Sequence, residues 1–337
     1  MKARLLEKLT AIRQGDPHAF ILADAKDADM AWGIPAPGSP WPPQGKTWHS
    51  MPEFRQSIRE IVADGVIDIL LGSVSQMSLL AHRERIFDRT EVTPAIRAND
   101  TTDIWCGRGM SYRESASRPF ASCDLAEVMA MTSPSLGWPD IDLGLYSITF
   151  NNDLEADRES LTAFKAFRLE AQRLGFRYFL EVFAPNLESH VAPADIPHFL
   201  NDQICRTLAG VPIGHGPVFL KIPFLSPRAI EDLATYDPDN LIVGILGGSS
   251  GTTHDAFKLL AEGQKHGARV ALFGRKIKDA EHPVEFVRHL RRITDGDLSP
   301  VEAVKSYHGS LEKLGIPAKR SVVDDLALTS AELSYAR

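Results

Sequence analysis

The chain has 337 residues, of which 44% are hydrophobic and 24% charged, a balance typical of a globular protein with a large buried core. Its 37 basic and 44 acidic residues give a formal net charge of −7, so a clustered basic surface for nucleic acid is not expected. Three widely separated cysteines favour a reducing compartment, and no apolar stretch is long enough for a signal peptide or a membrane span. We therefore expect a soluble cytoplasmic protein with no nucleic-acid or membrane partner.

Short apolar runs alternate with longer amphipathic stretches along the chain. Eight runs have the composition of parallel strands buried on both faces: 20–23, 67–71, 94–98, 145–150, 177–183, 218–223, 241–246 and 270–273. Apolar residues at helical spacing follow several of them, at 160–174, 255–266 and 283–293. This alternation predicts an α/β protein with a (β/α)8 TIM barrel. A doubly wound open sheet is the weaker alternative, because no GxGxxG turn follows the first strand.

Two stretches interrupt the alternation. Residues 33–48 are rich in proline and glycine and predict a long loop after strand one, while residues 101–135 predict a long, irregular segment after strand three. Long loops at the carboxyl ends of barrel strands often carry substrate specificity. Residues 299–315 predict an extra helix after the last strand. We expect a single barrel domain over residues 1–318, followed by a tail at 319–337.

A lysine interrupts the apolar run VFLKIPF of the sixth expected strand. An ammonium that is partly desolvated at a barrel mouth loses its proton more readily, which leaves a free amine able to attack a carbonyl. Lys221 is therefore a candidate nucleophile, although it could also pair with a carboxylate or reach solvent from a strand end. Glu181, in the run RYFLEVF of the fifth strand, is a candidate general acid or base, or an ion-pair partner that keeps Lys221 charged. Both interpretations place the two side chains in one pocket.

The loops after the last two strands have the composition of a phosphate site. Strand seven is followed by GGSSGTTHDAF, in which Gly247, Gly248 and Ser249 precede a helix whose N-terminus would add a positive dipole end. Strand eight ends in FGRK, where Gly274 and Arg275 take the matching position. Because these two loops form the usual phosphate site of barrels, we expect a small phosphorylated ligand. The alternative is a plain glycine-rich turn with a threonine helix cap.

Further charged residues lie at the ends of expected strands. Asp24 directly follows the first apolar run and is expected to face the pocket, with Lys26 two residues beyond it. Arg97 interrupts strand three, where it would bind a substrate oxygen or pair with Glu181 or Asp24. The 11 histidines show no HxH, HxxxH or Cys/His spacing at a strand end, so neither a catalytic metal nor a cofactor is expected.

Together these segments resemble the class I (Schiff-base) aldolases of the archaeal-type fructose-bisphosphate, tagatose-bisphosphate and sulfofructose-phosphate aldolase group. The matching pieces span most of the chain in order: Asp24 at the end of strand one, AIRANDTT, FLEVF, FLKIPF, GILGGSSGTTHDAFKLLAEGQKHGA and ALFGRKI. The resemblance implies that Lys221 forms the iminium and that Glu181 moves protons, and our own hypothesis adds Asp24 as a helper of Glu181. It also implies that phosphate is bound by Gly247, Gly248, Gly274 and Arg275.

The resulting hypothesis is reversible aldol cleavage of a phosphorylated ketose, or a related sugar, through a lysine Schiff base. Strand one has Asp24-Ala25-Lys26 where relatives have Asp-His or Asp-Gln, so Lys26 is a rival nucleophile. Two alternatives stay open: a metal-dependent aldolase or isomerase on the same barrel, and a sugar-phosphate-binding barrel without turnover. Enzymes of this group often form homo-oligomers, and no sequence feature specifies a symmetry.

Overall fold

Eight parallel strands form the central sheet of the protein, whose computed structural model describes residues 1–43, 45–132, 140–187, 190–248, 251–330 and 333. In chain order these strands are β1 (Ile21–Lys26), β2 (Ile69–Gly72), β3 (Thr93–Arg97), β6 (Leu143–Thr149), β7 (Arg177–Phe183), β8 (Leu220–Lys221), β9 (Gly244–Leu246) and β10 (Val270–Phe273). Their hydrogen-bonded order is β8-β7-β6-β3-β2-β1-β10-β9, and a parallel bridge between Ile222 and Ile245 joins the two end strands. The predicted (β/α)8 barrel is confirmed, with each strand within a few residues of an expected apolar run.

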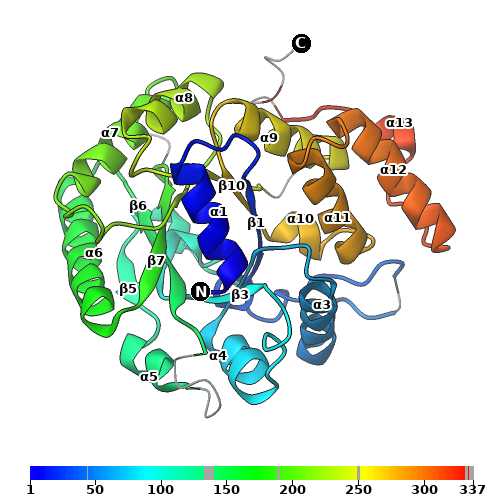
Figure 1. Ribbon diagram of the computed structural model, residues 1–337, viewed down its shortest axis with the longest axis horizontal. Helices are drawn as coiled ribbons and strands as arrows, with labels where there is room; N and C mark the ends of the chain where they lie inside the picture. The colour runs from blue at the N-terminus through cyan, green and yellow to red at the C-terminus, as the bar shows by residue number, and fades with distance from the viewer. Residues whose placement is uncertain (44, 133–139, 188–189, 249–250, 331–332, 334–337) are drawn as a thin grey trace.

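Helices surround this barrel (Figure 1). The longer ones are α3 (Met51–Asp64), α6 (Leu154–Leu174), α7 (Ile196–Leu208), α8 (Pro227–Tyr236), α9 (Thr253–Lys265) and α11 (Pro283–Thr294). The crossover after β2 contains α4 (Val74–Met77) and the π-helical turn η1 (Ser78–Arg83). α6 begins where the Asp153 side chain accepts a hydrogen bond from the Ala156 N–H, and it ends at Gly175, whose φ of 71° suits a helix C-cap.

The core has two layers, one inside the barrel and one between the barrel and its helices. In β1, Ile21 and Ala23 face the interior, whereas Phe20 and Leu22 pack towards the helices. The helix α1 (Ala3–Arg13) lies across the amino ends of the strands, where buried Leu5 and Leu9 join the interior cluster (Figure 1). The barrel interior is therefore filled and sealed at this end, and the carboxyl ends of the strands are where barrel enzymes hold their substrates.

The segment after β3 is more ordered than the sequence indicated. It contains β4 (Asn99–Thr101), the 3-10 turns η2 (Thr102–Ile104) and η3 (Tyr112–Glu114), β5 (Pro119–Ala121), which pairs with β4, and α5 (Leu125–Ala130). The Trp105 ring packs against Tyr112, at a centroid distance of 5.4 Å, and edge-on against Phe120, at 4.9 Å. These rings, which are dispersed in the sequence, form a small core of their own. We call residues 99–121 the β4–β5 excursion.

Short elements complete the chain. α2 (Asp29–Trp32) follows β1, and the described residues 33–43 and 45–48 lie in the expected long loop, in which the Trp41 indole donates to the Pro317 carbonyl at 2.7 Å. α10 (Arg275–Lys278) follows β10, the predicted extra helix is α12 (Pro300–Lys313), and α13 (Val322–Asp325) lies in the tail. Within the described ranges no helix combines the length and the apolarity that crossing a membrane requires.

Candidate active site

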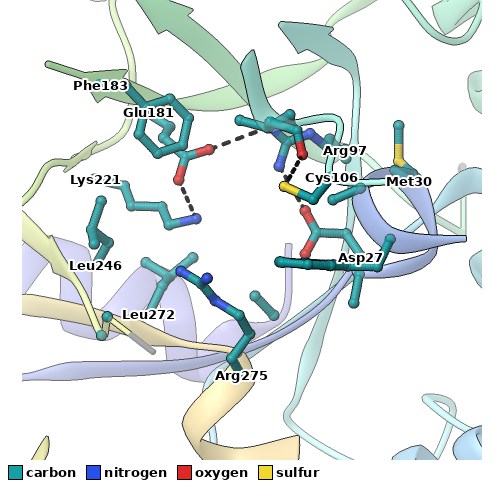
Figure 2. Close-up of a pocket in the computed structure, with 18 of the residues that line it drawn as sticks. Asp27, Met30, Arg97, Cys106, Glu181, Phe183, Lys221, Leu246, Leu272 and Arg275 are labelled. Carbon is teal, nitrogen blue, oxygen red and sulfur yellow. Dashed lines mark hydrogen bonds and ion pairs between the residues drawn. The ribbon is translucent and has the colours of Figure 1, made fainter. Parts of the chain in front are cut away.

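A cavity of about 420 Å³ opens at the carboxyl ends of the barrel strands. Its charged and polar lining comes from five of the eight strands, β1, β3, β7, β8 and β10, and from the segments that follow them: Asp27, Arg97, Asp103, Cys106, Arg113, Glu181, Asn186, Lys221, Arg275 and Lys278. Figure 2 shows Lys221, Asp27 and Arg275 bordering one open space. This is the mouth at which barrel enzymes place their reacting groups.

Lys221 and Glu181 meet at this mouth. They are register partners on the neighbouring strands β8 and β7, so their side chains leave the sheet on the same side. The Lys221 Nζ lies 2.5 Å from the Glu181 Oε1, and the two residues are only 8% and 1% exposed (Figure 2). The structure thus brings together the two residues that the sequence singled out, as a nearly dry amine–carboxylate pair that can exchange a proton directly.

A chain of polar contacts holds Glu181 in place. Its Oε2 accepts a hydrogen bond of 2.7 Å from the Ser147 hydroxyl, which in turn accepts one of 3.0 Å from Arg97. The Arg97 guanidinium also lies 3.6 Å from Glu181 and 2.9 Å from Asp27. Burial opposes the charge of Arg97, but three surrounding carboxylates outweigh that effect and raise the pKa of its guanidinium. Of the partners expected for Arg97, Glu181 is therefore one, while the closer carboxylate is Asp27 rather than Asp24.

Asp27 is a site residue that the sequence did not single out. Its carboxylate lines the cavity and lies across the open space from the Lys221 amine (Figure 2). Burial alone would raise the pKa of Asp27, but the positive charges of Arg97 and Lys221 more than offset it, so that pKa lies below its ordinary value. The pocket therefore offers a second, ionised carboxylate. Asp27 has the same parity along the chain as Ile21 and Ala23, whose side chains face the barrel interior.

Asp24, expected among the catalytic residues, does not line the cavity. It pairs in register with Leu70 and Phe273, which both face the helices, so its side chain leaves β1 on the outer face. There the Lys26 Nζ lies 2.8 Å from Asp24, and both residues are fully buried. Burial raises the pKa of Asp24, against the opposing charge of Lys26. The rival nucleophile Lys26 is thus enclosed behind the strand with its own counter-ion.

The two expected phosphate loops do lie at the mouth, where Gly247, Gly248, Gly274 and Arg275 all line the cavity. Ser249 falls outside the described residues. Glycine is required at two of these positions, because a Cβ on Gly247 would lie 2.2 Å from the Phe273 ring and one on Gly274 2.9 Å from the Ala25 carbonyl. At Gly247 and Gly274 the backbone therefore lies closer to the neighbouring atoms than a residue with a Cβ would allow.

The helix N-terminus expected to support phosphate is already occupied. The Asp325 Oδ1, from the tail, accepts a hydrogen bond of 2.8 Å from the Thr253 N–H of α9. The Thr252 N–H donates to Asp255 at 2.8 Å, and the Asp255 N–H donates to the Thr252 hydroxyl in a capping box. Three N–H groups of the first turn of α9 therefore bind the protein's own side chains, and this part of the expected anion site is not available.

Asp100 is a further titratable group beside the network. It is 2% exposed, the Trp105 indole donates to its Oδ2 at 3.2 Å, and Arg97 lies 3.4 Å from its Oδ1. Burial raises the pKa of Asp100 to about 6, although Arg97 and Trp105 act in the opposite direction. Asp100 therefore changes its charge near neutral pH within reach of Arg97. Among the described residues no group of three or more His, Cys, Asp or Glu side chains is placed to hold a metal ion.

No family model matches the chain, and neither does any curated protein. Solved structures do match. An archaeal fructose 1,6-bisphosphate aldolase superposes with a TM-score of 0.61 at 15% identity, covering 87% of this chain and 99% of the other. An archaeal fructose-1,6-bisphosphate aldolase with its catalytic Lys covalently bound to the carbinolamine intermediate gives the same TM-score and identity, over 87% and 100%. The fructose-bisphosphate aldolase from Slackia heliotrinireducens DSM 20476 matches with 0.61 and 15%, over 90% and 89%. The fold that the resemblance implied is thus confirmed: this chain has the same (β/α)8 barrel fold as these archaeal-type class I aldolases.

Proposed function

We propose that the protein is a class I aldolase that reversibly cleaves a phosphorylated ketose, or a related sugar, through a Schiff base on Lys221. The observation that carries this proposal is the position of the Lys221 amine, 2.5 Å from the Glu181 carboxylate and facing Asp27 across the cavity. An amine that can pass its proton to an adjacent carboxylate becomes a nucleophile. A second carboxylate on the far side of the substrate can then exchange protons with its hydroxyl groups.

The chemistry follows in balanced steps. The Lys221 amine, having given a proton to Glu181, attacks the ketone carbon, and the carbinolamine that forms loses water to become an iminium. A carboxylate takes the proton of the hydroxyl group β to the iminium carbon, the carbon–carbon bond breaks, and its electron pair moves into the iminium to form an enamine. The aldehyde leaves, the enamine carbon regains a proton, and water hydrolyses the new iminium to release the second product.

Asp27 takes the helping role that the sequence assigned to Asp24. It lies on the opposite side of the open space from Glu181, so the two carboxylates can serve protons at different substrate atoms (Figure 2). Ser147 and Arg97 keep Glu181 oriented. At the rim, the backbone of Gly248 and Gly274 and the Arg275 guanidinium would anchor the phosphate away from the breaking bond. Binding energy gained there helps to orient the reacting carbonyl.

Borohydride reduction tests the proposal. Incubation with a ketose phosphate and borohydride is expected to add the reduced sugar irreversibly to the peptide that contains Lys221, as seen by peptide mass mapping. Lys221→Met is expected to abolish both the adduct and cleavage, whereas Lys305→Met, on an exposed lysine in α12, serves as the matched control. A Lys221→Met protein that retains full activity would falsify the mechanism.

Two further measurements distinguish the proposed mechanism from the alternatives. A sugar-phosphate-binding barrel without turnover would show thermal stabilisation by the ketose phosphate but no borohydride adduct on any lysine. A metal-dependent aldolase or isomerase would lose its activity on treatment with a chelator, whereas the Schiff-base enzyme would keep it.

A further inference from the structure

Positive charge without a counter-ion gathers at the rim of the cavity. Deeper inside, Arg97 is paired with Asp27 and Lys221 with Glu181, while Lys278 lies 3.2 Å from Asp279. Two guanidinium groups lack such pairing. Within the described part of the chain, neither Arg275, after β10, nor Arg113, in η3 of the β4–β5 excursion, forms an ion pair with a carboxylate. Both residues line the cavity.

Contacts with the rest of the fold hold Arg113 at this rim. The Asn186 side chain, from the loop after β7, donates to the carbonyls of Arg113 and Ser115 at 2.9 and 2.8 Å. The Arg113 Nε donates to the Asp103 carbonyl at 2.9 Å, and the neighbouring Tyr112 packs against Trp105. The excursion is therefore tied to the loop after β7 at Arg113 and Ser115, and contacts within the excursion hold the Arg113 side chain.

Arg113 contacts Cys106, and Arg275 lines the same cavity. The Arg113 Nη2 lies 2.6 Å from the Cys106 Sγ. Burial raises the pKa of the Cys106 thiol, while the positive charges of Arg113 and Arg275 oppose that rise, so both act on the same sulfur. Figure 2 shows Cys106 and Arg275 facing the open space that Lys221 also borders. Since like charges held together repel, an anion placed between the two arginines would relieve that repulsion.

We propose that Arg113 and Arg275 together bind one dianionic group of the substrate, a phosphate monoester, beside Cys106, and that Arg113 is a specificity-determining residue for phosphorylated substrates. Two guanidinium charges match the two negative charges of the ester, and each planar group can donate two parallel hydrogen bonds to its oxygens. The identity of the substrate rests on the proposed aldolase function. The anion site itself does not require the Lys221 amine.

Calorimetric titration with inorganic phosphate tests the site directly. The native chain is expected to bind one phosphate, and Arg113→Gln and Arg275→Gln are each expected to weaken that binding about tenfold, as befits a charge-assisted hydrogen bond. Arg118→Gln is the matched control, because Arg118 lies on the same excursion but pairs with exposed Glu159. Unchanged affinity in Arg113→Gln would overturn the proposal, and so would two phosphates per chain, since that would mean separate sites.

Cys106 supplies a second measurement that is independent of activity. Phosphate is expected to slow iodoacetamide alkylation of Cys106 several-fold in the native protein and not in Arg113→Gln, with Cys205, in α7, as the internal control. Equal alkylation of Cys106 with and without phosphate would place the anion elsewhere and refute the shared site. Lys221→Met should retain both phosphate responses. The two proposals fail separately. If the native protein forms no borohydride adduct but responds normally to phosphate, only the aldolase function is contradicted. If it forms the adduct but does not respond to phosphate, only the shared anion site is contradicted.

Discussion

Asp24 and Lys26 form an ion pair of 2.8 Å that is sealed between the barrel and its helices, on the face of β1 opposite Asp27. Both residues are 0% exposed. A buried ion pair contributes little net stability, but breaking one half of it leaves an uncompensated charge in a dry environment. The pair therefore belongs to the architecture of the barrel wall, and it can be separated from the chemistry by mutation.

Lys26→Met is expected to lower the free energy of unfolding by about 3–5 kcal/mol, because Asp24 then stays buried without a counter-ion. The double variant Asp24→Asn/Lys26→Met should recover most of that loss. Urea denaturation measures both changes. Borohydride trapping on the folded fraction of Lys26→Met should still label Lys221 fully, whereas loss of the label in this folded fraction would instead make Lys26 the nucleophile.

Glu181→Gln is expected to lower the turnover rate by roughly 10²–10⁴-fold, the usual contribution of a positioned acid or base. Glutamine keeps the shape and can still accept the hydrogen bond from Ser147, so binding of the ketose phosphate should change little. Steady-state kinetics over a range of pH measure the effect. Ser147→Ala, which removes only the orienting hydroxyl, should cost less than about tenfold. A rate for Glu181→Gln close to that of the native enzyme would assign the proton transfers to Asp27.

Asp100 is expected to make stability depend on pH. Because burial raises its pKa in the folded protein from 3.8 to about 6, the folded state binds this proton more tightly than the unfolded chain does. The resulting stabilisation is present at low pH and is lost as the pH rises through about 6. Asp100→Asn should therefore be more stable than the native protein at pH 8, by up to roughly 3 kcal/mol.

That advantage of Asp100→Asn should shrink as the pH falls towards 4, where the native carboxyl also becomes neutral. Urea denaturation of the two proteins at several pH values measures the difference, in which the other titrating groups largely cancel. A difference that stays constant from pH 8 to pH 4 would show that the Asp100 carboxyl does not titrate as described.

The contact between Asp325 and α9 predicts that the tail stabilises the barrel. Asp325→Ala would leave the Thr253 N–H without its acceptor and His308 without its partner. By analogy with the loss of a helix N-cap, we expect a decrease in stability of about 1–2 kcal/mol. Asp324→Ala is the control, because Asp324 is exposed and bonds only the neighbouring Ser321, which makes its expected loss smaller. Equal losses in the two variants would mean that the long-range contact contributes nothing.

The strands could be read from the sequence because parallel strands buried on both faces are continuous apolar runs. The pairing of Lys221 with Glu181 followed as well, since each residue interrupts such a run near its carboxyl end, on strands that are consecutive around the barrel. The same property explains the misplacement of Asp24. When both faces of a strand are apolar, composition does not tell which parity points inward, so Asp24 and Asp27 could not be distinguished by hydrophobicity.

The remaining differences arise from contacts between segments far apart in the chain. Nothing near α9 indicates that its N–H groups bind Asp325, about 70 residues later, and propensity within the excursion does not show that Trp105, Tyr112 and Phe120 pack together. Arg113 was overlooked for this reason, because only the folded excursion carries it to the cavity. Local pattern predicts the strands of a barrel better than it predicts which loop residues return to its mouth.

The seal that Leu5 and Leu9 of α1 form at the amino ends of the strands has a kinetic consequence. Because the amino end of the barrel is sealed, both products of the proposed cleavage would leave through the cavity mouth at the carboxyl ends of the strands. In the proposed mechanism the fragment attached to Lys221 would lie at the inner end of this passage, so the free aldehyde would leave first. We therefore expect ordered release, with a different pattern of product inhibition for each fragment.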